Sequence, residues 1–169
     1  MGKVLRLLTA VVATLSLPLI ASAQKSAVFA PFGFMLGDWT AAGNGTGAGA
    51  GGSSAIHMAL GGRAIERRDR IIPKDGAPFD AWMIVYPEAN GIRAEFFDSE
   101  GHIIHYAGRV VAAGCVQFLS EGSAIQPGYR LTYQSLKPDV LHIKFEIAPP
   151  GGAFKAYTEG DLNRVGRAE

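Results

Sequence analysis

Short runs of alternating apolar and polar residues, separated by turn-forming residues, make up the chain after residue 36. The clearest run is 139–147 (DVLHIKFEI), in which Leu141, Ile143 and Phe145 share one face and His142 lies on the other. A period of two is typical of a half-buried β-strand. We find no run in this region with the period of an amphipathic helix.

About ten such runs follow one another along the chain. They lie at residues 38–42, 53–60, 63–72, 80–87, 92–98, 102–111, 115–121, 128–136, 139–147 and 154–165. Asn90-Gly91 stands between two of them and predicts a type I′ hairpin, because both residues tolerate positive φ. Short strands at this spacing predict an all-β fold: one up-and-down antiparallel barrel of about ten strands, with a short N-terminal segment at one end. Closure is favoured because it leaves no exposed strand edge.

The first 23 residues have the pattern of a secretory signal peptide. Lys3 and Arg6 precede an uncharged apolar segment, and Ala21-Ser22-Ala23 supplies a small-residue cleavage site. The apolar segment is shorter than the roughly 20 residues that cross a membrane as a helix, so no membrane anchor is expected. The sequence therefore predicts a signal peptide over residues 1–23 and one exported domain over residues 24–169.

Charge narrows the range of partners. Removing residues 1–23 takes away two basic residues and no acidic one, so the formal charge changes from +1 to −1. A nearly neutral domain without a basic cluster is not expected to bind nucleic acid. The single cysteine, Cys115, cannot form an internal disulfide.

The run 63–72 (RAIERRDRII) places charges on an apolar face. Ile65 and Ile71 share their face with Arg67 and Asp69, and this face is expected to point inward. Buried charges need partners, water or a ligand. Two explanations stay open: Arg67 and Asp69 form a mutual ion pair near the barrel mouth, or Arg67 binds an anionic or carbonyl group of a ligand.

Other inward faces follow from alternation. In 53–60 these are Ile56, Met58 and Leu60, and in 128–136 they are Tyr129, Leu131 and Tyr133. An aromatic wall is expected from the two strands that Asn90-Gly91 joins. Its members are Trp82, Ile84 and Tyr86 on the first strand and Ile92, Ala94 and Phe96 on the second. The candidate ligand-binding residues are Arg67, Trp82, Tyr86, Phe96, His105, Tyr106 and Tyr133.

The histidines do not predict a metal site. His102 and His105 are three residues apart, which on a strand sends them to opposite faces. His57 and His142 are expected to lie outside the barrel, so no set of three zinc ligands is present. A catalytic triad drawn from Ser99, His105 and Asp98 lacks any elbow or oxyanion-hole motif.

The glycine-rich segment 43–52 is interpreted as a flexible hairpin loop. It contains a G-x-G-x-x-G match, but a strand-like run follows it. A phosphate site needs a helix at that position.

Several segments resemble known barrels. Gly37-Asp38-Trp39 in FMLGDWTAAGNG is similar to the G-x-W opening of lipocalin-like (calycin) barrels, and LGGRAIERRDR and WMIVYPEANGIRAEFFDSEG resemble a bacterial lipocalin-like family of unknown function, many of whose members are secreted. The resemblance implies a barrel with a cavity in which Trp39 packs under Arg164 and closes one end. It also implies export to a bacterial periplasm or secretion.

Related nitrobindin-like haem barrels imply a proximal histidine late in the chain. The last histidine, His142, is expected to face outward, so no cofactor is predicted. The leading functional hypothesis is a binding protein for a small apolar or amphipathic molecule, including one with an anionic end. Two alternatives remain: a small barrel enzyme with acid–base or isomerase-like chemistry from Arg67, Asp69 and His105, and an envelope interaction protein with a filled barrel.

Overall fold

The computed structural model describes residues 27–47, 49–120 and 122–166, so the expected signal peptide lies outside the described residues. A 3₁₀ helix, η1 (Ala30–Met35), precedes the strands. The strands are β1 (Gly37–Ala41), β2 (Thr46–Gly47), β3 (Gly49–Ala59), β4 (Ala64–Pro73), β5 (Phe79–Glu88), β6 (Gly91–Asp98), β7 (Ile103–Ala112), β8 (Cys115–Ser120), β9 (Gly128–Lys137), β10 (Val140–Ala148) and β11 (Lys155–Gly166). Within the described ranges, no helix has the length and apolar character needed to cross a membrane.

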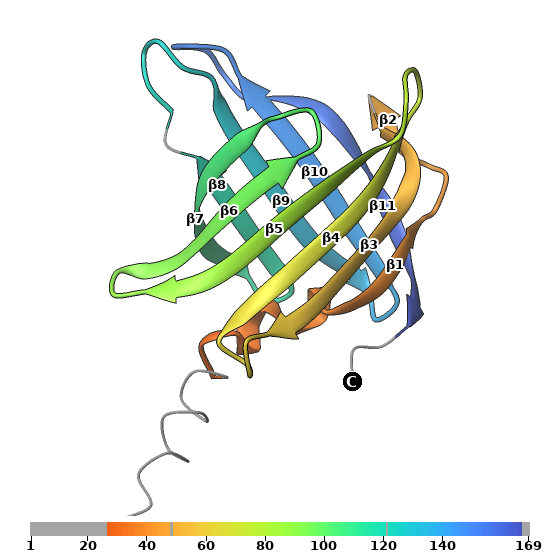
Figure 1. Cartoon of the computed structure of the whole chain (residues 1–169), viewed down its shortest axis with the longest axis vertical. Coiled ribbons are helices and arrows are strands. Elements are labelled where there is room, and N and C mark those ends of the chain that lie inside the picture. Colours follow the sequence, from red (N-terminus) through yellow and green to blue (C-terminus); the bar gives the residue numbers. More distant parts are fainter. Residues whose placement is uncertain (1–26, 48, 121, 167–169) are drawn as a thin grey trace, which may run out of the picture.

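The strands form one closed antiparallel barrel (Figure 1). From β3 to β11 each strand pairs with the next one in the chain, and β1 pairs with both β3 and β11. The short β2 also pairs with β11, so β1 and β2 occupy successive parts of one position in a ten-stranded barrel. The predicted fold class is therefore confirmed.

One end of the barrel is plugged by η1 and by the end of β11. The ring of Phe32 in η1 lies 6.1 Å from that of Phe118 on β8. Trp39 on β1 is 1% exposed, its Nε1 donates a hydrogen bond to the carbonyl of Met35 (2.9 Å), and the Arg164 guanidinium lies 4.0 Å from its ring centroid. The expected Trp39–Arg164 contact at a closed end is thus confirmed.

Burial along the inner face falls from this closed end to the other. Inward residues nearest the closed end are almost fully buried: Ile56, Val85, Ala94, Val116, Tyr133 and Leu141 are 0–1% exposed. Farther along the same strands, Phe96, Tyr129 and Phe145 are only partly buried against the core. We call these two parts the closed half and the open half of the barrel.

The glycine-rich segment was wrongly expected to be a loop throughout. Residues 46–47 and 49–52 belong to β2 and β3. At Gly52, φ is +127°, and a Cβ would lie 2.0 Å from the carbonyl oxygen of Arg70 on β4. The absence of a side chain at Gly52 therefore permits β3 and β4 to pair closely. A need for a flexible loop is not the reason for a glycine at this position.

Two details at the strand ends also differ from prediction. Met58 and Leu60 do not face the core: Met58 is exposed at the end of β3, and Leu60 lies in the following turn with φ 52° and is 74% exposed. The Asn90-Gly91 hairpin forms, but its loop residues are Ala89 and Asn90, because Glu88 pairs with Gly91. Among the described non-glycine residues Leu60 alone has positive φ, so the turn is not type I′.

Candidate functional site

The aromatic wall predicted from β5 and β6 does not form. The buried inward residues of β5 are Ala81, Met83 and Val85, and Trp82 is 38% exposed on the outer face. A two-residue hairpin loop pairs odd-numbered with even-numbered positions, so Phe96 shares the inner face with Met83 and not with Trp82. The wall combined even-numbered residues of both strands, which this geometry forbids.

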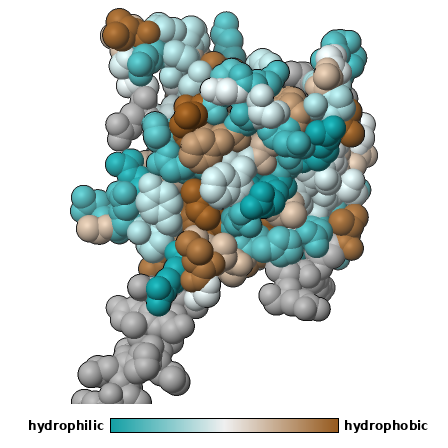
Figure 2. Space-filling view, viewed as in Figure 1, coloured by the Kyte–Doolittle hydropathy of each residue, from teal (hydrophilic) through white to brown (hydrophobic). Residues whose placement is uncertain are grey.

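Trp82 and Tyr86 instead belong to the outer surface. Trp82 Nε1 donates to Glu66 (2.9 Å), and its ring stacks on Phe97 with centroids 5.6 Å apart. The Tyr86 hydroxyl donates to Glu95 (3.1 Å). Apolar side chains gather over β5 and β6 on this outer face (Figure 2).

His105 is also outside the barrel, where its Nδ1 pairs with Glu95. It therefore cannot act in the cavity with Arg67 and Asp69, and the acid–base constellation expected there is not assembled. Each of the other three histidines pairs with a carboxylate too. These pairs are His57–Asp38 (2.8 Å), His102–Asp98 (2.8 Å) and His142–Asp161 (2.7 Å).

His102 lies in the loop before β7 at the open end, away from His105 on the outer face, so the two do not share an ion site. One group among the described residues, Asp98, Glu100 and His102, has ligand-type atoms within 4.8 Å of one another. Asp98 already accepts hydrogen bonds from the backbone N–H groups of Glu100 and His102. These contacts explain the group as a stabilised turn.

Four predicted site residues do face inward: Arg67, Phe96, Tyr106 and Tyr133. Arg67 forms the mutual ion pair with Asp69, its Nε donating to Oδ1 at 2.8 Å. Its Nη1 also donates to the Tyr133 hydroxyl. Because β4 and β9 occupy opposite walls of the barrel, Arg67 spans the interior and marks the boundary between its closed and open halves.

We call the connected residues Arg67, Asp69 and Tyr133 the bridge. Burial and neighbouring charges determine the protonation of its arginine and its tyrosine. Burial alone would lower the pKa of Arg67, but the charge of Asp69 and the Tyr133 hydroxyl raise it above its ordinary value. Burial raises the pKa of Tyr133 and of Tyr106 above their ordinary values. At neutral pH Arg67 is therefore a cation that faces the carboxylate of Asp69, and both tyrosines are neutral.

Ser54 is a further interior polar residue that the sequence analysis missed. It lies opposite Asp69 on β3, and its Oγ is a buried atom with no hydrogen-bond partner in the described chain. Asp69 Oδ2 is also without a well-directed hydrogen bond, although it lies 2.8 Å from Arg67 Nη2. The ion pair stabilises this carboxylate oxygen even without a directed hydrogen bond, because opposite charges attract at that distance in any orientation. Ser54 could have been found from its even spacing to Ile56.

Aromatic rings lie on the open side of the bridge. Tyr129 and Phe145 stack with centroids 6.1 Å apart and planes 4° apart, and Phe96 extends from β6. The open half thus combines a partly buried aromatic lining with one unsatisfied polar atom, Ser54 Oγ, opposite Asp69. That combination is typical of a small-molecule site.

Comparison with known proteins adds little to this geometry. No model of a known protein family matches the chain, and no curated protein matches it. Among solved structures, the chain is similar to a de novo designed fluorescence-activating β-barrel. The two are 15% identical over 78% of this chain and 94% of that one, with a TM-score of 0.42.

Proposed function

We propose that the open half of the barrel binds a small, largely apolar molecule. The observation that carries this proposal is the buried Ser54 Oγ without a hydrogen-bond partner, opposite Asp69, in a barrel whose open half is lined by partly buried aromatic rings. An unsatisfied buried polar group costs about 1–3 kcal/mol. A ligand group that bonds to it recovers that cost, and the rings cover the apolar part of the ligand.

The bridge changes the expected charge of the ligand. Arg67 already pairs with Asp69, so an anion would add a second negative charge beside the one present. Ser54 Oγ can donate or accept a hydrogen bond, whereas the carboxylate oxygen Asp69 Oδ2 can only accept one. The ligand of this proposal is therefore amphipathic with a neutral polar end that donates a hydrogen bond, such as a hydroxyl or N–H group.

The proposal extends to the family to which the protein belongs and to its location in the cell. The Trp39–Arg164 contact supports membership of the bacterial lipocalin-like family that the sequence resembles. The charge and apolar pattern of residues 1–23 supports export to a periplasm or the medium. The intact mass of the protein isolated from its source should match a chain that begins at Gln24, and a mass that includes residues 1–23 would contradict export by cleavage.

Two dyes with one ring skeleton test the binding proposal. N-phenyl-1-naphthylamine is neutral and has an N–H donor, and 1-anilinonaphthalene-8-sulfonate adds a sulfonate. Fluorescence titration should show saturable binding of the neutral dye that is at least as tight as binding of the sulfonate. Tighter binding of the sulfonate would contradict the neutral polar end. Binding of neither dye would contradict the site and favour a filled barrel.

A further inference from the structure

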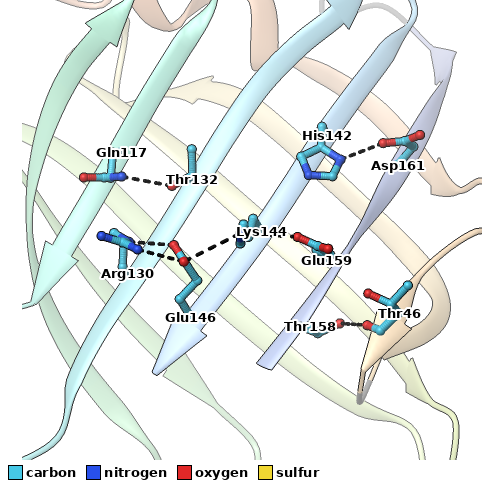
Figure 3. Close-up of polar contacts among 10 residues, drawn as sticks. All are labelled: Thr46, Gln117, Arg130, Thr132, His142, Lys144, Glu146, Thr158, Glu159 and Asp161. Atoms are coloured by element: carbon cyan, nitrogen blue, oxygen red, sulfur yellow. Dashed lines mark hydrogen bonds and ion pairs between the residues drawn. The ribbon is translucent and has the colours of Figure 1, made fainter. Parts of the chain in front are cut away.

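A groove on the outside of the barrel holds a second group of polar side chains, separate from those of the interior. It has a volume of about 390 Å³, is open to solvent, and crosses β9, β10, β11 and the segment that links β1 to β2. Its main side chains are Asn44, Gln134, Leu136, His142, Glu159 and Asp161. Figure 3 shows the β10–β11 part of this face, with His142 and Asp161 pointing toward each other from neighbouring strands.

The carboxylate in this groove is fixed from two sides. Asp161 Oδ1 lies 2.7 Å from His142 Nδ1, and Asp161 Oδ2 accepts a hydrogen bond from Asn44 Nδ2 at 2.7 Å. The Asn44 Oδ1 accepts from the backbone N–H of Asp161 in return. Gly160 allows this approach, because a Cβ there would lie 2.8 Å from the Cα of Gly45.

These contacts set the tautomer of the imidazole. Hydrogen bonds from His142 and Asn44 lower the pKa of Asp161 below its ordinary value, so its carboxylate is ionised and only accepts hydrogen bonds. His142 Nδ1 must therefore carry a proton. In neutral His142, Nε2 then has a free lone pair, and no residue of the described chain bonds to it.

The groove supplies two more parts of a reactive site. Gln134 lies directly opposite His142 on β9, and no hydrogen bond occupies its side-chain amide within the described chain. Directly opposite residues in a sheet have Cβ atoms about 5 Å apart, so an amide N–H can reach a group held near Nε2. Leu136 is half exposed beside them and offers an apolar contact.

We propose that this groove hydrolyses small, uncharged esters, with His142 as the general base. Nε2 takes a proton from water as the water oxygen bonds to the ester carbonyl carbon, and the Gln134 amide donates to the developing oxyanion. The tetrahedral intermediate collapses by breaking its bond to the alcohol oxygen, which receives the proton from Nε2. Asp161 is a positioning residue that keeps the proton of neutral His142 on Nδ1. Asn44 fixes the orientation of the Asp161 carboxylate.

Hydrolysis of 4-nitrophenyl acetate tests this site against a matched control. His105 also pairs through Nδ1 with a carboxylate directly across a strand pair, but it lies outside the groove. His142→Gln should lower the rate above the spontaneous reaction by about tenfold or more, and His105→Gln should leave it unchanged. Equal losses in the two variants would show ordinary surface imidazole reactivity and overturn the proposal, as would an unchanged rate in His142→Gln.

The tautomer gives a readout that survives if His142→Gln does not fold. In ¹⁵N NMR spectra of the wild-type protein, neutral His142 should carry its proton on Nδ1. In Asp161→Asn the proton should move toward Nε2 while the hydrolysis rate falls. A proton on Nε2 in the wild-type protein, or a rate that Asp161→Asn leaves unchanged, would overturn the proposed base.

Discussion

The two halves of the barrel interior differ in what fills them. In the closed half, η1 and the ends of β1 and β11 cover an apolar core whose inward side chains are almost completely buried. In the open half the same strands carry half-buried rings, and the Arg67–Asp69–Tyr133 bridge separates the two parts. The comparison indicates that the closed half supplies most of the stability, because its apolar side chains are the more completely buried, and the proposed ligand would lie in the less completely buried open half.

Removing Trp39 should have the largest effect on stability. Trp39→Ala loses a fully buried ring, the hydrogen bond to Met35 and the contact with Arg164, at an expected cost of about 3–5 kcal/mol. Tyr129→Ala in the open half should cost only about 1–2 kcal/mol, because a half-buried ring removes less apolar area from water. Denaturant titration measures both, and equal losses would contradict the division into halves.

Removing the counter-ion of Arg67 should lower the free energy of unfolding nearly as much as Trp39→Ala does. Asp69→Asn leaves the charge of Arg67 buried without its counter-ion, and we expect a loss of about 3 kcal/mol in the free energy of unfolding. Replacing both partners, with Arg67→Met and Asp69→Leu, should recover much of that loss. If the double variant is less stable than Asp69→Asn, the bridge stabilises the fold and does not merely satisfy two buried charges.

The buried tyrosines at the bridge should make the barrel sensitive to alkali. Burial raises the pKa of Tyr106, so above about pH 10 the unfolded chain loses this proton while the folded chain keeps it. The free energy of unfolding should therefore fall as pH rises, by about 1.4 kcal/mol per pH unit for each such tyrosine. Tyr106→Phe should make this slope shallower in unfolding titrations between pH 10 and 11.5. An unchanged slope would contradict the burial argument.

The sequence predicted the fold well because a barrel strand repeats one local pattern. The turn residues and the period of two located the strands to within a few residues, apart from β2 and the glycine-rich start of β3, which were expected to be loop. The positions of Trp39 and Arg164 in the first and last strands predicted their contact, since closure makes those strands neighbours.

The site was harder to predict because β5 is apolar on both faces. In DAWMIVYPE, alternation does not identify the inner face, and the larger rings of Trp82 and Tyr86 were wrongly placed inside. The structure buries the smaller Ala81 and Val85 there. The Arg67–Asp69 pair was among the predicted alternatives, but its contact with Tyr133 crosses the barrel and depends on tertiary packing.

The most direct test of ligand binding in the open half compares two adjacent phenylalanines of β6. Phe96 faces the interior and Phe97 packs on Trp82 outside, and both are partly buried. Phe96→Ala should raise the dissociation constant of N-phenyl-1-naphthylamine about fivefold to tenfold, equivalent to about 1 kcal/mol of lost aromatic contact, while Phe97→Ala leaves it unchanged. A larger rise in Phe97→Ala than in Phe96→Ala would place the dye on the outer surface and contradict binding inside the barrel.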